Sequence, residues 1–137
     1  MTVRPWFAGA SAEPAARVVS DMRIDVPAEG SFVRPVRLLV GDAASRAGFG
    51  FDEIEDLRLA ITESYYGILS TEATVLSVRV QLGPGCIVAS GHVDAGFASE
   101  PDLHAMTSFV VDLVCDRWIL DTSGERASFW FEKRARR

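Results

Sequence analysis

The stretch "DEIEDLRLAITESYYGILS", residues 52 to 70, carries the clearest structural pattern in the chain. Its apolar residues recur at helical spacing and predict an amphipathic helix. The expected buried stripe consists of Ile54, Leu57, Ile61, Tyr65 and Ile68. Asp52 and Glu55 have the spacing of a capping box at the start of the helix. The helical period places Asp56, Ala60, Glu63 and Gly67 together on the side away from this stripe.

Gly67 is unexpected in the interior of this helix. A glycine there costs about 1 kcal/mol relative to alanine, so its presence needs a separate reason. Either another segment approaches the backbone closely at this point, or a side chain that once stood there has been lost.

The segments before this helix predict a strand followed by another helix. Alternation at Met22, Ile24 and Val26 predicts a first strand that ends at Pro27. A first helix follows, capped by Ser31, with Arg34, Arg37 and Arg46 off its apolar side. The apolar side of this first helix is Phe32, Val36, Leu39, Val40, Ala43 and Ala47.

The second half of the chain predicts two hairpins separated by a third helix. "TVLSVRVQL", "GPG" and "CIVASGHV" form the first hairpin, and "RWILD", "TSGE" and "ASFWFEK" form the second. The helix between them is marked by Leu103, Met106, Val110, Leu113 and Val114. Met106 and the aromatic residues Phe129, Trp130 and Phe131 are expected in the core.

This order of elements predicts an α/β two-layer sandwich, with a mixed, mainly antiparallel sheet covered by helices on one face. The length of 137 residues suits one domain. We expect a flexible tail over residues 1–16, the domain over 17–133 and a basic, solvated tail over 134–137. The basic cluster that includes Lys133, Arg134, Arg136 and Arg137 is assigned to that frayed end.

Composition excludes several classes of function. The net charge of −5, from 19 acidic and 14 basic residues, argues against nonspecific nucleic-acid binding and favours a protein partner. No apolar run is long enough to span a membrane, and the first residues do not resemble a signal peptide, so a cytoplasmic location is expected. Cys86 and Cys115 are expected to be buried free thiols, and His92 and His104 have no partner at metal-ligand spacing.

Three motifs resemble a known family. "DLRLAITES" at 56–64, "VDAG" at 93–96 and "LVCDRW" at 113–118 are similar to the anti-sigma-factor serine kinases of the GHKL (Bergerat-fold, histidine-kinase-like) ATPase superfamily. The resemblance extends over about residues 18–133. It implies the histidine-kinase-like ATPase fold.

The resemblance also implies where ATP and magnesium would bind. Glu63 matches the family's catalytic acid, and Gly67 stands where the family has a magnesium-binding Asn. Asp94 and Gly96 match part of the adenine-binding Asp-x-Gly-x-Gly loop, whose last glycine is Ala98 here. The glycine-rich lid expected before the third helix has no glycine in "ASEPDLHAMTSF". The resemblance therefore implies a degenerate ATP site, with no metal and no working cofactor.

Each of these residues also has a structural explanation. Asp94 and Gly96 fit a common turn after a strand, and Glu63 fits a solvated acid on a polar helix face. Arg34 fits an exposed surface arginine, although "EGSFVR" at 29–34 is similar to the family segment that contacts the sigma factor or its antagonist. The resemblance assigns that contact to Arg34, with Arg37 beside it.

The resemblance predicts an anti-sigma factor that sequesters an alternative sigma factor and is released by a STAS-type anti-anti-sigma partner. The alternative is an active ATP-dependent serine/threonine kinase that phosphorylates this antagonist, and a further one is a scaffold for another regulator. A homodimer is also expected, because Leu59 and Tyr66 lie outside the core stripe of their helix. These two residues could instead pack under the first helix.

Overall fold

The computed structural model describes residues 19–95, 101–122 and 126–136, with residues 101–105 described by backbone alone. The predicted tail at residues 1–16 lies outside these ranges. The elements are β1 (Ser20–Pro27), a 3-10 turn (Gly30–Phe32), α1 (Val33–Arg46), α2 (Phe51–Ile68), β2 (Val75–Gly83), β3 (Cys86–Val93), α3 (Pro101–Val114), β4 (Arg117–Asp121) and β5 (Ser128–Arg134). The predicted order of helices and strands is confirmed.

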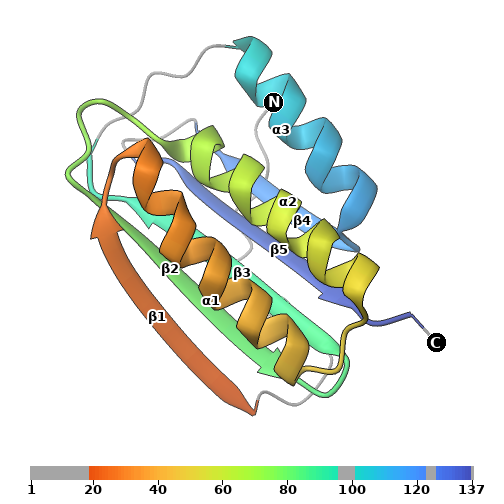
Figure 1. Cartoon of the computed structure of the whole chain (residues 1–137). Coiled ribbons are helices and arrows are strands. Elements are labelled where there is room, and N and C mark those ends of the chain that lie inside the picture. The colour runs from red at the N-terminus through yellow and green to blue at the C-terminus, as the bar shows by residue number, and fades with distance from the viewer. Residues whose placement is uncertain (1–18, 96–100, 123–125, 137) are drawn as a thin grey trace.

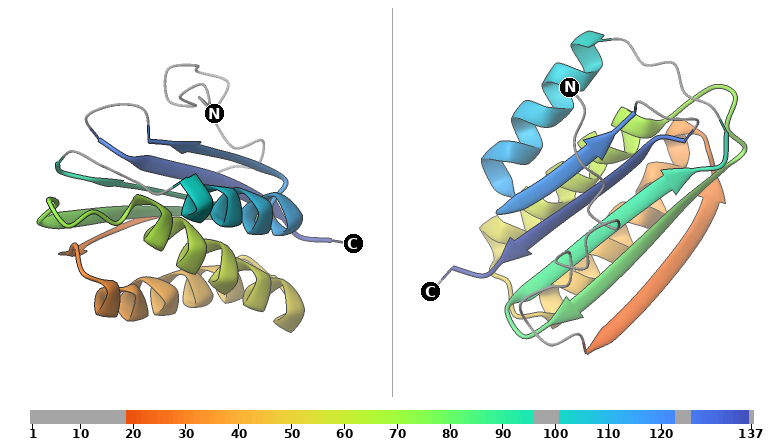
Figure 2. Two further views of the ribbon diagram at one scale, coloured as in Figure 1. Left: turned by 90° about the horizontal axis from the view of Figure 1, so that it is seen from above. Right: turned by 180° about the vertical axis from the view of Figure 1, so that it is seen from behind.

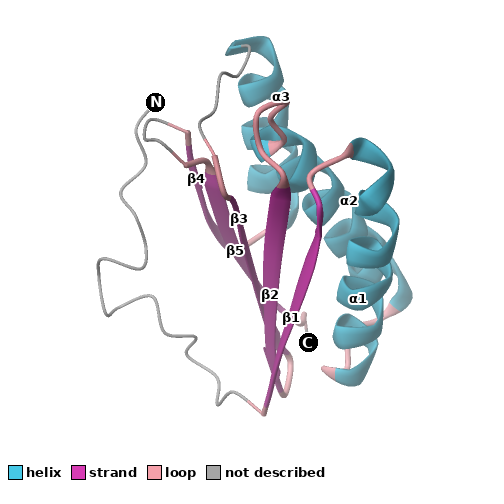
Figure 3. Ribbon diagram, turned by 90° about the vertical axis from the view of Figure 1, so that its left-hand side faces the viewer, coloured by secondary structure: helices cyan, strands magenta, loops and turns pink. Residues whose placement is uncertain are grey.

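The strands form one sheet in the order β1-β2-β3-β5-β4, and all four pairings are antiparallel. The sheet was expected to be mixed and mainly antiparallel, and no parallel pairing occurs among the described strands. All three helices lie on one face of the sheet, with α2 between α1 and α3 (Figures 1 and 3). Figure 2 shows the opposite face, which no described helix covers.

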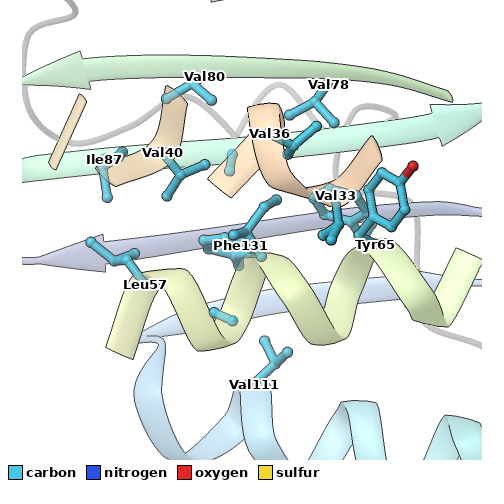
Figure 4. Close-up of a cluster of buried hydrophobic side chains, with 14 of the residues drawn as sticks. Val33, Val36, Val40, Leu57, Tyr65, Val78, Val80, Ile87, Val111 and Phe131 are labelled. Carbon is cyan, nitrogen blue, oxygen red and sulfur yellow. The ribbon is translucent and has the colours of Figure 1, made fainter. Parts of the chain in front are cut away.

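The core lies between the helices and the sheet (Figure 4). Four of the five predicted stripe residues of α2 are fully buried, and Ile54 packs at the edge of the core. They meet Val36 and Val40 from α1 and Phe131 from β5. Burial of an aliphatic or aromatic side chain contributes about 1.5–3 kcal/mol, so this layer dominates the stability of the fold.

The predicted helix starts differ from those in the structure. The N-cap of α2 is Gly50, and its backbone N–H faces the carboxylate of Glu53 at 3.5 Å, so the helix begins before Asp52. In α1 the N-cap is Phe32, without a side-chain cap from Ser31. Phe32 is also exposed, and Val33 takes the core position that was expected for it.

The predicted apolar side of α3 is wrong at Met106 and Leu113, whereas Val114 packs against the core as expected. Met106 and Leu113, which were expected in the core, are about two-thirds exposed, as is Phe109. The buried side consists of Thr107, Val111 and Cys115. The predicted side fails because α3 packs on α2 through a small polar residue, and a pattern of large apolar residues does not reveal such a contact.

The first residue of the basic C-terminal cluster lies in a strand and not in a frayed tail. Lys133 is buried in β5, and its ammonium donates to the backbone oxygen of Val114 at 2.6 Å. A cation at the C-terminal end of α3 interacts favourably with the helix dipole and donates a hydrogen bond to a terminal carbonyl. Beyond β5, the backbone N–H of Arg136 donates to Glu53 at 3.0 Å. The prediction for Lys133 is therefore wrong.

Cys86 and Cys115 are both buried, and neither forms a disulfide bond with another described residue, as expected. Burial raises the pKa of the Cys115 thiol to about 12, so this thiol stays protonated at neutral pH. Within the described residues, no helix has the length and apolar character needed to cross a membrane.

Candidate functional site

Gly67 is a point of close approach between α2 and α3. A β-carbon built on this glycine would lie 3.0 Å from the hydroxyl oxygen and 3.1 Å from the methyl carbon of Thr107. The same hydroxyl donates to the backbone oxygen of Glu63 at 3.3 Å. Gly67 is buried, so the face of α2 that was expected to be polar forms a packed contact with α3.

This contact bears on the predicted magnesium position. Of the two explanations for the glycine, close approach by another segment is what the structure contains. Magnesium requires near-octahedral oxygen ligands, and glycine has no side chain to supply one. The space beside its α-carbon is taken by Thr107. Residue 67 and its neighbour on α3 therefore do not fit a magnesium-binding position.

The carboxylate of Asp94 is held by the first residues of β2. It accepts hydrogen bonds from the backbone N–H and the hydroxyl of Thr74, at 2.8 and 2.5 Å, and from the N–H of Val75 at 3.1 Å. These donors lower the pKa of Asp94 to about 2, the Thr74 hydroxyl most strongly. Asp94 therefore fixes the start of β2 at the end of β3.

The other predicted nucleotide residues are placed as follows. Glu63 is half-buried on the α3 side of α2. Gly96 and Ala98, together with the first part of the predicted lid, lie outside the described residues. No three His, Cys, Asp or Glu side chains among the described residues lie close enough to hold a metal ion.

The two predicted partner-binding arginines lie on the outer surface of α1. Arg34 and Arg37 are exposed, and with Leu38 and Arg58 they line a cavity of about 290 Å³. Arg58 comes from α2, where its side chain crosses Gly41: a β-carbon on that glycine would lie 2.9 Å from the Arg58 Nε. We call this surface, formed by Arg34, Arg37, Leu38 and Arg58, the arginine pocket.

Two tyrosines of α2 hold the segment that leads into α1. The hydroxyl of Tyr65 donates to the backbone oxygen of Glu29 at 2.5 Å, and that of Tyr66 donates to Gly30 at 3.2 Å. Burial raises the pKa of Tyr65 to about 12, so its hydroxyl remains a donor. These bonds set the position of the segment just before Arg34.

Sequence reasoning missed Arg58, Thr107 and the hydroxyl role of Tyr65. Mid-helix glycines gave the available signal for two of them, because both Gly41 and Gly67 mark places where a side chain from another helix crosses the backbone. The identity of the crossing side chain depends on the tertiary fold.

Comparisons with known proteins agree with this fold. The RsbW serine-protein kinase of Bacillus velezensis is 41% identical over 46 residues, which are 34% of this chain and 29% of that protein. The RsbW of Bacillus cereus is 35% identical over 48 residues, covering 35% and 30%. The matched segment thus spans less than a third of the length of these relatives. No family model matches the chain.

A solved structure extends the likeness to most of the chain. The crystal structure of the RsbU and RsbW domains of Rv1364c from Mycobacterium tuberculosis superimposes with a TM-score of 0.63 and 16% identity. The match covers 85% of this chain and 32% of that one. The resemblance expected from the sequence is confirmed for the fold and for part of the sequence: the chain has an RsbW-like α/β fold and is similar over about a third of its length to the RsbW serine-protein kinases.

Proposed function

We propose that the chain is an anti-sigma factor. It binds an alternative sigma factor, blocks its engagement with RNA polymerase and is released by a STAS-type anti-anti-sigma partner. The observation that carries the proposal is the arginine pocket, where Arg34 and Arg37 are joined by Arg58 on an exposed surface. The likeness to RsbW proteins supports a partner of this class.

The chemistry of the arginine pocket suits an acidic or carbonyl-bearing protein surface. Arginine presents a planar fork of donors that binds carboxylates through paired, charge-assisted hydrogen bonds. Arg34 and Arg37 make no ion pair with another described residue, so no described carboxylate competes with a partner for their donors. Leu38, which is about two-thirds exposed, adds an apolar contact in the same pocket.

The test uses affinity purification of the tagged full chain from its native cell, followed by binding measurements with the recovered partner. Truncation of a central interface arginine typically costs about 2 kcal/mol or more, roughly thirtyfold in affinity. Arg34→Ala should show such a loss, and Arg37→Ala and Arg58→Ala should each weaken binding.

Arg46→Ala is the matched control, because Arg46 ends the same helix and is exposed but pairs with Asp42 at 2.7 Å. It should bind as tightly as the native chain. Recovery of neither a sigma factor nor a STAS-type protein, or native affinity in Arg34→Ala, would show that the proposal is wrong.

The proposed function does not depend on strong binding of ATP. Gly67 supplies no magnesium ligand, Thr107 occupies the space beside it, and the Asp94 carboxylate already accepts three hydrogen bonds. We therefore expect ATP with magnesium to bind far more weakly than a kinase requires. Calorimetry tests this: a dissociation constant in the low micromolar range, about −8 kcal/mol, would favour the active kinase instead.

A further inference from the structure

The face of the sheet opposite the helices carries a row of polar side chains that the proposed function does not use. Strand register aligns one residue from each strand across the whole sheet. In sheet order the row is Asp25, Ser77, His92, Ser128 and Asp121. Val93 is fully buried towards the helices, so alternation turns its neighbour His92 to the opposite face.

The surface around His92 is hollowed into two adjoining cavities. One, of about 270 Å³, is lined by Asp121, Arg126 and Ser128 among others. The other, of about 200 Å³, includes Arg23, Ser77 and Arg79. Ser90 and His92 line both cavities, so the two adjoin, and we call them together the sheet groove. Together they have the volume of a small-molecule site.

The sheet groove carries three arginines, together with the carboxylate of Asp121 and, in the same polar row, that of Asp25. Arg79 is neutralised by Asp21, to which it donates twice, at 2.8 and 2.5 Å. Arg23 and Arg126 make no ion pair with another described residue.

The pKa of His92 is lowered from its ordinary value by burial and by the neighbouring arginines. Burial lowers the pKa of His92 most, and the charges of Arg126 and Arg23 lower it further. Asp25 and Asp94 oppose this shift with smaller effects. The two arginines therefore act on His92 more strongly than the two nearby carboxylates do, and a bound anion would offset their effect.

We propose that the sheet groove binds the phosphate group of a small molecule, with Arg23 and Arg126 on its two sides and His92 between them. Guanidinium groups bind phosphate oxygens through paired, charge-assisted hydrogen bonds. The hydroxyls of Ser77, Ser90 and Ser128 add neutral donors along the floor of the groove. The site lies on the opposite side of the sheet from α1 and the arginine pocket, so its failure and that of the proposed function are separable.

The experiment follows His92 itself by proton NMR in the full chain. A His104→Gln background leaves His92 as the only histidine signal, since the chain has two histidines. Inorganic phosphate and glycerol phosphate are added in separate titrations, with sodium chloride as the ionic-strength control. Binding should shift the His92 signal to a plateau and raise its pKa, because a bound anion stabilises the imidazolium.

The arginines supply the decisive comparison. Loss of one charged hydrogen-bonding partner should weaken the binding about tenfold in Arg23→Gln and in Arg126→Gln. Arg126→Lys should recover part of the loss, and Arg46→Gln on α1 should change nothing. Tighter binding of glycerol phosphate would identify an ester ligand, and tighter binding of inorganic phosphate would identify the free ion. Absence of a plateau up to about 50 mM of either compound, or native affinity in both glutamine variants, would overturn the proposal.

Discussion

Thr107 packs directly against Gly67, with its hydroxyl oxygen 3.0 Å from the place where a β-carbon would stand. Alanine at position 67 would gain about 1 kcal/mol in helix propensity, but crowding in a packed interior costs about 1–3 kcal/mol. We expect Gly67→Ala alone to lower the free energy of unfolding by about 1 kcal/mol. Urea denaturation measures the change.

The double variant isolates the contact. In a Thr107→Ala background only the β-carbon of residue 107 remains, 3.5 Å away, which is an ordinary contact distance. There Gly67→Ala should raise the free energy of unfolding by about 1 kcal/mol, the gain from helix propensity. Equal effects of Gly67→Ala in the two backgrounds would contradict this account of the glycine.

Glu132 offers a second test, because its carboxylate is fully buried. It accepts from Arg117 at 2.6 Å and from Arg134 at 3.3 Å, and both arginines are about half exposed. Glu132→Ala should lower the free energy of unfolding by about 2 kcal/mol, through loss of charged hydrogen bonds and of packing. Arg134→Ala is the milder control, because its contact is long and partly solvated. A larger loss in Arg134→Ala would refute this ranking.

Asp94 should make stability depend on acid pH. Its pKa is about 2 in the folded chain, against an ordinary value of 3.8. The unfolded chain therefore takes up a proton first, so the stabilisation is complete above pH 3.8 and is lost as pH falls towards 2. Thermal midpoints between pH 2 and 5 should fall less steeply in Asp94→Asn than in the native chain. Parallel curves for the two proteins would show that another carboxyl, such as Asp21, causes the slope.

Tyr65 should affect partner binding without touching the partner. Tyr65→Phe removes the hydrogen bond to Glu29 and leaves the segment before Arg34 less firmly held. We expect about 1 kcal/mol lower stability and weaker partner binding, although every arginine is retained. Tyr66→Phe, whose bond to Gly30 is longer and more exposed, should change both quantities less. Binding by calorimetry and stability by denaturation distinguish the two effects.

The predicted homodimer remains a prediction. Leu59 and Tyr66 are both exposed, so neither is fully covered by α1. Sedimentation of the chain without partner should show self-association that Leu59→Arg weakens. Phe109→Arg on α3 is the matched control, since Phe109 is a large apolar residue with even greater exposure. If Phe109→Arg alone produced the monomer, the dimer contact would lie on α3.

Local patterns predicted much of the fold because the burial of one side of each element is visible in that element's own sequence. The alternation at Met22, Ile24 and Val26 and the helical spacing at Leu57 and Ile61 both follow from one-sided burial. The sequence therefore predicted these elements in the right order.

The site was predicted less well, because its contacts join segments far apart in the chain. Arg58 reaches across Gly41, and Thr107 meets Gly67, through pairings of helices that no local period specifies. Lys133 was assigned to a solvated tail from its charge, but the carbonyl of Val114 gives it a buried partner. Composition alone does not locate such a partner.

The strand order also limits how another protein can approach. β1 and β4 lie at the two margins of the described sheet, where unpaired backbone groups could recruit a strand from another chain. β4 is only five residues long. β1 carries Asp21, Arg23 and Asp25 on its outer face and ends at Pro27. Short length, charge and proline all discourage strand addition, so extension of the sheet by a partner or by aggregation is disfavoured.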